Sequence, residues 1–260
     1  MPMNYPGKAQ RVLVTAGGSG IGRAAAERFS SAGADVYICD ISDKALQETL
    51  RELPGVRGSL ADVGDSRQVE ALCRDAQSTM GGIDVLLNNA GISGPRAAVE
   101  DIEYEDWNQT LRINLSGMFH CIKQVVPHMK AQGGGAIINI VTASVKTGLP
   151  NRLPYIASKS AVLGMSHTLA RELGPHNIRC NCILPGLIDN ERGRALIAAY
   201  ASENSLSPET ARQEFLRYVS MRTFIQPEEI GDMAVFLASD AARHVTGQEI
   251  AVDGNAEWEV

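Results

Sequence analysis

Short apolar runs alternate with helix-like patterns along nearly the whole chain, and this alternation limits the possible folds most strongly. The runs are almost continuously apolar, which is typical of strands that are buried on both faces of a parallel sheet. They occupy residues 11–15, 35–40, 56–60, 84–89, 136–141, 178–185 and 249–253. The helical patterns occupy residues 20–32, 43–53, 66–80, 105–131, 154–173 and 227–239. This order predicts an α/β fold with a doubly wound parallel sheet of about seven strands and helices on both faces.

The length of the chain and its lack of linker-like segments predict one domain. A chain of 260 residues accommodates one α/β domain with a full core. We therefore expect residues 1–260 to form a single Rossmann-like domain. Residues 187–223 are polar and helical where the alternation predicts a short connection. Because insertions at the carboxyl edge of such sheets usually cover a ligand crevice, we expect 187–223 to be a lid over the substrate.

Composition and charge exclude several classes of partner. The formal net charge is -6 and no basic run is present, so we expect no nucleic acid partner. The apolar runs are too short to span a bilayer and the first ten residues lack an apolar signal core, so we expect a cytoplasmic protein without membrane contact. The five cysteines are scattered and no Cys/His group has zinc spacing, so we expect no metal site.

A glycine-rich turn, TAGGSGIG at residues 15–22, joins the first strand to the first helix. Glycine allows close approach of the backbone to phosphate, and the first N–H groups of the following helix favour an anion. The alternative is a tight strand-to-helix turn without a ligand. In the cofactor interpretation, the contacts to the dinucleotide come from Gly17, Ser19, Gly20 and Ile21.

Asp40 strengthens the cofactor interpretation. It ends the second strand, 18 positions after Gly22, close to the offset of about 20 residues at which an acid binds the adenosine ribose hydroxyls. A carboxylate there repels a 2′-phosphate, and neither Ile41 nor Ser19 supplies a cation that would attract one. We therefore expect NAD as the cofactor in preference to NADP. The alternative for Asp40 is a solvated acid at the end of a strand.

Polar and small residues also follow the third and fourth strands. Asp62 and Val63 end the third strand, and Asn89 and Gly91 follow the fourth. Because the carboxyl ends of parallel strands share one edge, these residues are expected beside the glycine turn. An aspartate there can accept a hydrogen bond from the adenine amino group. Each pair, taken alone, also fits ordinary turn chemistry.

Tyr155 and Lys159 are spaced i,i+4 in a helical pattern, so their side chains share one face of the helix. A free tyrosine has a pKa of about 10 and is a poor acid or base at neutral pH. A neighbouring ammonium group favours the phenolate and lowers that pKa. The alternative is an exposed helix pair without a catalytic role.

Together these segments resemble the short-chain dehydrogenase/reductase family over nearly the whole chain. The segments are TAGGSGIG, Asp40, ADV at 61–63, NNAG at 88–91, YIASK at 155–159, PG at 185–186 and TGQEIAVDG at 246–254. The resemblance implies an NAD(P)-binding oxidoreductase that interconverts a secondary alcohol and its ketone. It also implies a small-molecule substrate and a homotetramer or homodimer, assembled through the helices at 105–131 and 154–173 and the C-terminal strand region.

The resemblance further implies roles for individual residues. Tyr155 would donate or accept the proton, while Lys159 would hold the nicotinamide ribose and lower the pKa of Tyr155. Asn114 resembles the family asparagine that holds a water molecule beside this lysine. Asn89 and Gly91 would line the cofactor, and the backbone around Ile188 would meet its carboxamide.

Three positions depart from the family pattern. Ala16 replaces the first glycine of the turn, and we expect at most a modest change in affinity because a methyl group is tolerated if φ is negative there. Asn190 stands where many relatives have a threonine near the carboxamide, and it can still form hydrogen bonds. The family serine that lies 13 positions before the tyrosine is replaced by Thr142.

Thr142 and Ser144 are therefore both candidates for the hydroxyl that polarises the substrate oxygen. Thr142 fits without a gap and is preferred, whereas Ser144 would require a local bulge. If neither hydroxyl reaches the substrate, catalysis should be slow, because a polarising hydrogen bond is missing. The alternative function is then a catalytically weak NAD-binding sensor or scaffold protein of the same fold.

Loops at the expected active edge carry several arginines: Arg96, Arg152, Arg192 and Arg194. Converging guanidinium groups suit a carboxylate, phosphate or sulfonate. One hypothesis is therefore an anionic hydroxy compound or its ketone as substrate, with Arg96 and Arg152 as contacts. The alternative is that these arginines are surface charges paired with Glu191, Glu203 or Glu214.

Overall fold

The structure is a computed structural model that describes residues 10–256. Seven strands form one sheet in the order β3-β2-β1-β4-β5-β6-β7, and each neighbouring pair is parallel. The strands are β1 (Arg11–Thr15), β2 (Asp35–Asp40), β3 (Arg57–Leu60), β4 (Val85–Asn88), β5 (Gly135–Ile140), β6 (Ile178–Pro185) and β7 (Glu249–Val252). The predicted doubly wound α/β fold is confirmed, and each predicted strand agrees to within one residue at either end.

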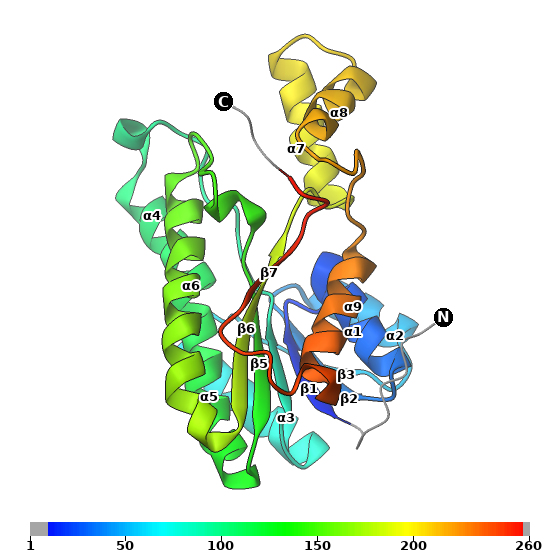
Figure 1. Cartoon of the computed structure of the whole chain (residues 1–260), viewed down its shortest axis with the longest axis vertical. Helices are drawn as coiled ribbons and strands as arrows, with labels where there is room; N and C mark the ends of the chain where they lie inside the picture. The colour runs from blue at the N-terminus through cyan, green and yellow to red at the C-terminus, as the bar shows by residue number, and fades with distance from the viewer. Residues whose placement is uncertain (1–9, 257–260) are drawn as a thin grey trace.

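The helices pack on both faces of the sheet. They are α1 (Gly20–Ser31), α2 (Asp43–Glu52), α3 (Ser66–Met80), α4 (Tyr104–Leu111), α5 (Gly117–Gln132), α6 (Leu153–Leu173), α7 (Glu191–Glu203), α8 (Pro208–Arg217) and α9 (Pro227–Ala238). One core cluster joins α3, α5 and α6 to the sheet, and a second joins α1, α2 and α9 to the opposite face (Figure 1). The five inner strands are covered on both faces, which explains why their sequences are almost continuously apolar. The edge strands β3 and β7 are partly exposed.

The strand order creates the crevice in which a ligand can bind. The chain runs outward from β1 to β3 and then returns to place β4 on the other side of β1. In open α/β sheets, ligands bind outside the carboxyl ends of the strands at such a switch point. The glycine turn follows β1 and residues 89–91 follow β4, so both lie at the switch point.

The helix predicted at 105–131 is interrupted, which corrects the sequence prediction. A π-helical segment, Arg112–Ser116, joins α4 to α5. Such π-bulges insert an extra residue into a helical turn and frequently lie at functional sites. Asn114 lies in this segment and is fully buried.

Helices α7 and α8 lie beyond the carboxyl ends of the strands (Figure 1). They account for most of the segment 187–223 and pack on each other through a small cluster: Ile197, Ala201, Ala211, Leu216 and Phe224. Asp189 accepts hydrogen bonds from Arg194 and Arg212, so the entry to α7 is tied to both helices. The two helices therefore have a core of their own above the sheet edge.

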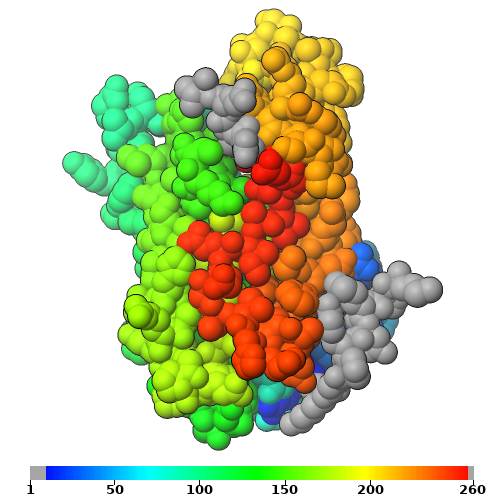
Figure 2. Space-filling model, viewed as in Figure 1, coloured from blue at the N-terminus to red at the C-terminus, as the bar shows by residue number. Residues whose placement is uncertain are grey.

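The edge strand β7 lies at the surface between α6 and α9 (Figure 2). It pairs with β6 alone, from Glu249 opposite Cys182 to Val252 opposite Pro185. The α-helices within residues 10–256 lack the combination of length and apolar character that a membrane span requires.

Candidate active site

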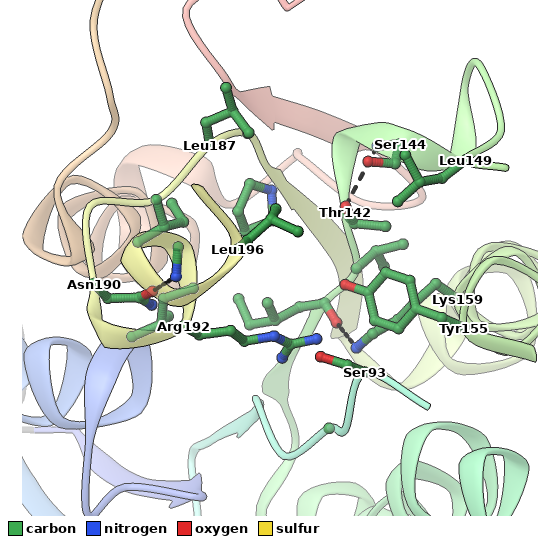
Figure 3. A pocket seen from close by; sticks show the side chains of 18 of the residues that line it. Ser93, Thr142, Ser144, Leu149, Tyr155, Lys159, Leu187, Asn190, Arg192 and Leu196 are labelled. Carbon is green, nitrogen blue, oxygen red and sulfur yellow. Dashed lines mark hydrogen bonds between the residues drawn. The ribbon is translucent and has the colours of Figure 1, made fainter. Parts of the chain in front are cut away.

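A cavity of about 460 Å³ opens at the carboxyl edge of the sheet, between the loops after β4, β5 and β6 and helix α7 (Figure 3). It brings together many of the residues singled out in the sequence. These are Ile21, Asn89, Gly91, Thr142, Ser144, Arg152, Tyr155, Lys159, Ile188 and Asn190.

Tyr155 and Lys159 lie one turn apart near the start of α6, which begins with Leu153 and Pro154. Proline suits the first turn of a helix because its missing N–H group would have no intrahelical partner there. Lys159 is 3% exposed, and its Nζ donates to the carbonyl oxygen of Ile140 at 2.8 Å. Burial and the nearby charge of Arg192 lower the pKa of Lys159 to about 7.

Thr142 and Ser144 both line the cavity and lie close together in Figure 3. Thr142 precedes a 3₁₀ turn, Ala143–Val145, and its Oγ1 accepts a hydrogen bond from the Ser144 backbone N–H at 3.3 Å. Ser144 reaches the cavity without the bulge that the sequence analysis required for it, because the 3₁₀ turn after β5 brings it there. Both hydroxyls are thus placed on the wall that faces Tyr155.

Asn114 lies behind the cavity wall and is bound to the loop after β4. Its Oδ1 accepts from the Ile92 backbone N–H at 2.7 Å, and its Nδ2 donates to the Ile92 carbonyl and to Ser158 Oγ, both at 3.0 Å. A Cβ added at Gly91 would lie 3.2 Å from Asn114 Oδ1 and 3.3 Å from Lys159 Nζ. Asn114 and Lys159 therefore meet at Gly91, where a side chain would contact both of them closely.

Ser158 is a residue of this site that the sequence analysis missed. Its Oγ accepts from Asn114 and donates to the Tyr155 carbonyl oxygen at 2.7 Å. The signal was present in the segment YIASK, where this serine directly precedes Lys159. Ser158 links the π-helical segment to the first turn of α6.

The glycine turn contradicts the negative φ angle on which the expectation for Ala16 depended. The φ angle of Ala16 is +50°, in the left-handed region that favours glycine. Its carbonyl oxygen lies where a side chain on Gly22 would clash, and it accepts a hydrogen bond from Asn89 Nδ2 at 3.1 Å. The close packing of the turn on α1 therefore imposes this φ value whatever residue stands at position 16.

The same turn has the shape that a dinucleotide requires. A Cβ on Gly17 would lie 2.6 Å from Ile38 Cβ, and one on Gly18 would lie 2.8 Å from Asp40 Oδ2. Ser19 stands at the N-cap of α1, and its side chain makes no capping hydrogen bond, so it does not occupy the first N–H groups of the helix. The N–H groups of Gly17 and Gly18 already donate to the Cys39 carbonyl oxygen and to Asp40. The donors left for a ligand are the first N–H groups of α1, and such a helix N-terminus fits a bound pyrophosphate.

Asp40 and Asp62 are held in place by the surrounding backbone and side chains. Asp40 is 8% exposed, and its carboxylate accepts from the backbone N–H groups of Gly18 at 3.0 Å and Ser42 at 2.9 Å. Asp62 accepts from the Gly64 N–H at 2.8 Å and forms an ion pair with Arg112 at 3.0 Å. Arg112 was not anticipated, because the pairing joins segments that are 50 residues apart.

Two expected cofactor contacts flank these acids and differ in exposure. Ile41 is 68% exposed beside Asp40, whereas Val63 is 6% exposed and packs in the core next to Asp62. Gly20 has a φ angle of +51° at the mouth of the turn, where only Asn190 Nδ2 lies near its absent side chain. The residues expected to contact the cofactor thus lie along one edge of the sheet, from the glycine turn to the ends of β2 and β3.

The arginines divide into two pairs. Arg152 and Arg192 line the cavity, whereas Arg96 and Arg194 do not. Arg96 forms an ion pair with Glu203 at 3.1 Å, and Arg194 pairs with Asp189 at 3.0 Å. Arg96 was expected to contact the substrate, but it forms a surface ion pair, which was the alternative.

Among the described residues, the lining of the cavity contains three cations and no carboxylate. The cations are Arg152, Lys159 and Arg192. The remainder of the lining is largely apolar and includes Leu149, Leu187, Leu196, Ile197, Phe215 and Phe224. Residues 10–256 contain no group of three or more His, Cys, Asp or Glu that could hold a metal ion.

Comparison with known proteins identifies relatives that cover nearly the whole chain. A family model described as enoyl-(acyl carrier protein) reductase matches residues 15–255. The 3-oxoacyl-[acyl-carrier-protein] reductase FabG of Thermotoga maritima is 36% identical over 246 residues, which cover 93% of this chain and 95% of that protein.

Two solved structures are similar in fold and sequence. Levodione reductase superposes with a TM-score of 0.88 and 33% identity, covering 94% of this chain and 96% of that chain. A variant of actinorhodin polyketide ketoreductase with NADPH gives a TM-score of 0.90 and 32% identity, covering 95% and 96%.

Proposed function

Because this chain belongs to the short-chain dehydrogenase/reductase family of oxidoreductases, we propose that it interconverts a secondary alcohol and its ketone with NAD. The observation that carries the proposal is the cavity at the carboxyl edge of the sheet. Tyr155, Lys159 and the hydroxyl residues Thr142 and Ser144 line it together. A sensor or scaffold would not need this set of groups to converge on one small-molecule cavity.

The proposed roles follow from the positions of the side chains. A nicotinamide cofactor supplies a hydride acceptor or donor when it is bound. Tyr155 exchanges the hydroxyl proton with the substrate oxygen, as a general base in oxidation and a general acid in reduction. Thr142 or Ser144 donates a hydrogen bond to the same oxygen and stabilises the negative charge that develops there.

Lys159 and Asn114 support Tyr155 in this proposal. Lys159 lies one turn after Tyr155 on α6, and its protonated form places a positive charge on the same side of the helix. Asn114 fixes the loop after β4 through both backbone groups of Ile92, and through Ser158 it reaches the first turn of α6. We propose that this arrangement holds Gly91 and Lys159 in position to contact the cofactor and a water molecule beside the lysine.

The choice of NAD rests on Asp40. Family membership alone does not decide between the two nicotinamide cofactors, since the similar ketoreductase structure contains NADPH. Asp40 presents a carboxylate oriented by two backbone N–H groups, which suits ribose hydroxyls and repels a 2′-phosphate. Ile41 beside it is apolar and exposed. In this proposal Gly17, Ser19, Gly20 and Ile21 contact the cofactor, together with Asp62, Val63, Asn89, Gly91 and Ile188.

Binding of NADH and NADPH tests this choice without knowledge of the substrate. We expect wild type to bind NADH at least about ten times more tightly than NADPH, because like charges in contact cost several kcal/mol. Asp40→Ser should remove most of this preference, whereas Asp43→Ser, a change of the nearby exposed acid at the start of α2, should leave it intact. Equal binding of the two cofactors by wild type would refute the assignment.

The finer proposal is that the substrate is an anionic hydroxy compound or its ketone. Arg152 and Arg192 line the cavity, and no carboxylate of residues 10–256 lines it, which supports this class. The test is turnover with NAD and with NADP over hydroxy acids, sugars, sterols and simple diols. Faster turnover of hydroxy acids is the expected result, and turnover confined to neutral alcohols would exclude the class.

We further propose that residues 1–260 form one domain in which 187–223 is the lid over the substrate, and that the protein works in the cytoplasm as a homotetramer or homodimer. The lid is supported by the position of α7 on the cavity, where it contributes Arg192, Leu196 and Ile197. Assembly is supported by Phe119, which is 50% exposed on α5.

A further inference from the structure

Two guanidinium groups approach the ring of Tyr155 from different parts of the fold. Arg152 directly precedes α6, and its Cζ lies 5.5 Å from the centre of the Tyr155 ring. Arg192 is the second residue of α7, and its Cζ lies 5.6 Å from the same centre. Figure 3 shows the Arg192 side chain extending from α7 across the cavity toward Tyr155.

The two arginines differ in how they are held. Arg152 is partly buried and donates from Nη2 to the Ser93 carbonyl oxygen at 2.9 Å, while its buried Nε has no hydrogen-bond partner. The Arg192 side chain forms neither an ion pair nor a hydrogen bond within residues 10–256, although Asn190 caps its helix through the Gly193 N–H. Arg152 is therefore fixed to the loop after β4, whereas Arg192 belongs to the proposed lid.

Nearby acids are engaged elsewhere and do not neutralise this pair. Glu203 is bound to Arg96, and Asp189 is bound to Arg194 and Arg212. Burial and the charge of Arg192 both lower the pKa of Arg152, so the two guanidinium groups beside the Tyr155 ring repel each other. Convergence of like charges without a counter-ion is unfavourable, so an anion bound between them would relieve the repulsion.

We propose that Arg152 and Arg192 clamp the anionic group of a compact substrate, with that group within a few bonds of the reacting carbon. We refer to these two residues as the arginine clamp. Both arms lie beside the ring that carries the reacting hydroxyl, so an anion that meets both must also lie close to that hydroxyl. Two planar guanidinium groups suit a carboxylate or a sulfonate, each of which offers several acceptor oxygens. The inference rests on the proposed function for the reaction, but the binding site itself does not require turnover.

The arginine clamp would also favour closure of the lid when an anion is bound. An anion between the arms attracts Arg192, and with it the start of α7, toward α6. A neutral ester or amide of the same acid lacks this attraction. The protein should therefore distinguish a free acid from its neutral derivatives although their hydroxyl groups are the same.

Binding of an unreactive probe tests the arginine clamp separately from catalysis. Isobutyrate and its neutral amide, isobutyramide, have the same shape and no hydroxyl to oxidise, and their affinities can be compared by calorimetry at constant ionic strength, with and without NADH. We expect isobutyrate to bind at least about ten times more tightly than the amide. Arg152→Gln and Arg192→Gln should each weaken isobutyrate binding by about tenfold or more, since each removes charge-assisted hydrogen bonds.

Arg194→Gln is the matched control, because it makes the same change on the same helix outside the cavity. It should alter isobutyrate binding by less than about twofold, as is usual for exposed ion pairs. Arg152→Lys keeps the charge of this partly buried residue but not the planar fork. If Arg152 binds the anion directly, this variant should retain part of the affinity for isobutyrate. Equal binding of acid and amide, or an equal loss in the Arg194→Gln control, would overturn the arginine clamp.

Turnover distinguishes failure of the arginine clamp from failure of the proposed function. If alcohols are oxidised and Tyr155→Phe abolishes the reaction, but Arg152→Gln raises KM equally for a hydroxy acid and its methyl ester, the clamp is wrong and the function stands. If isobutyrate binding follows the arginines but no alcohol or ketone reacts, the clamp stands and the proposed function is wrong.

Discussion

At the scale of single residues, Ala16 holds a backbone conformation for which it is poorly suited. Its φ of +50° places a methyl group in the left-handed region, at a cost of roughly 1–2 kcal/mol for an L-residue. The methyl group recovers part of this cost by packing against the core cluster beneath α3, α5 and α6. The sequence could reveal the substitution but not its cost, because φ depends on how closely the turn approaches Gly22.

Replacing this alanine tests the conformation directly. In ordinary backbone, Ala→Gly lowers the free energy of unfolding by roughly 0.5–1 kcal/mol. Since strain is relieved at a positive φ, we expect Ala16→Gly to leave it unchanged or to raise it by up to about 1 kcal/mol. Urea denaturation of the two proteins measures the difference, and a loss of about 0.5 kcal/mol or more would contradict the assigned conformation.

Lys159 predicts a pH dependence of stability. Its folded pKa of about 7 lies below its ordinary value of 10.5, so between these values the unfolded chain binds the extra proton. Stability from this residue therefore rises with pH above about 7, by up to about 1.4 kcal/mol per pH unit. Below pH 7 both states are protonated and the cost of burying the charge is constant.

Comparison of wild type with Lys159→Met isolates this contribution, because the variant cannot titrate at that position. The difference in free energy of unfolding, wild type minus variant, should rise when urea denaturation of cofactor-free protein is repeated from pH 7 to pH 9. A difference that is flat over this range would show that the burial of Lys159 does not lower its pKa.

At the scale of elements, the π-helical segment Arg112–Ser116 joins the loop after β4 to helix α6. Both Asn114 and Arg112 point away from the helix axis toward other segments: Asn114 bonds to Ile92 and Ser158, and Arg112 pairs with Asp62. The apolar pattern predicted a continuous helix at 105–131 because a π-bulge preserves helical backbone angles on both sides. Contacts between residues far apart in sequence, such as Asp62 with Arg112, leave no local signal.

Loss of the Asn114 side chain should therefore weaken the fold as well as the site. Asn114→Ala leaves the part-buried N–H and carbonyl of Ile92, and the buried Oγ of Ser158, without their present partner, and we expect the free energy of unfolding to fall by about 1–3 kcal/mol. Asn108→Ala, a change of an exposed residue on α4, should cost less than about 0.5 kcal/mol. Thermal or urea unfolding checks both, and equal effects would mean that the contacts of Asn114 do not stabilise the junction.

At the scale of the whole molecule, the parallel sheet and the edge that holds the cavity follow from sequence patterns. Apolar strands and short βα turns are encoded locally, so the sequence predicts that TAGGSGIG, Asp40 and YIASK lie on one edge. Which of the arginines would line the cavity was not predictable in this way. Arg152 and Arg192 reach the cavity while Arg96 and Arg194 find acids elsewhere, and only the packing of α7 and α8 determines which carboxylates are near.

The account as a whole depends on proton exchange at Tyr155 coupled to hydride transfer with NAD. The most direct measurement is the rate of NADH formation by wild type and Tyr155→Phe with the hydroxy acid that wild type oxidises fastest. Phenylalanine keeps the ring beside Arg152 and Arg192 but removes the reacting hydroxyl. We expect kcat to fall by about 10²–10⁴-fold, with isobutyrate binding unchanged. A Tyr155→Phe protein that retains full turnover would contradict the central claim.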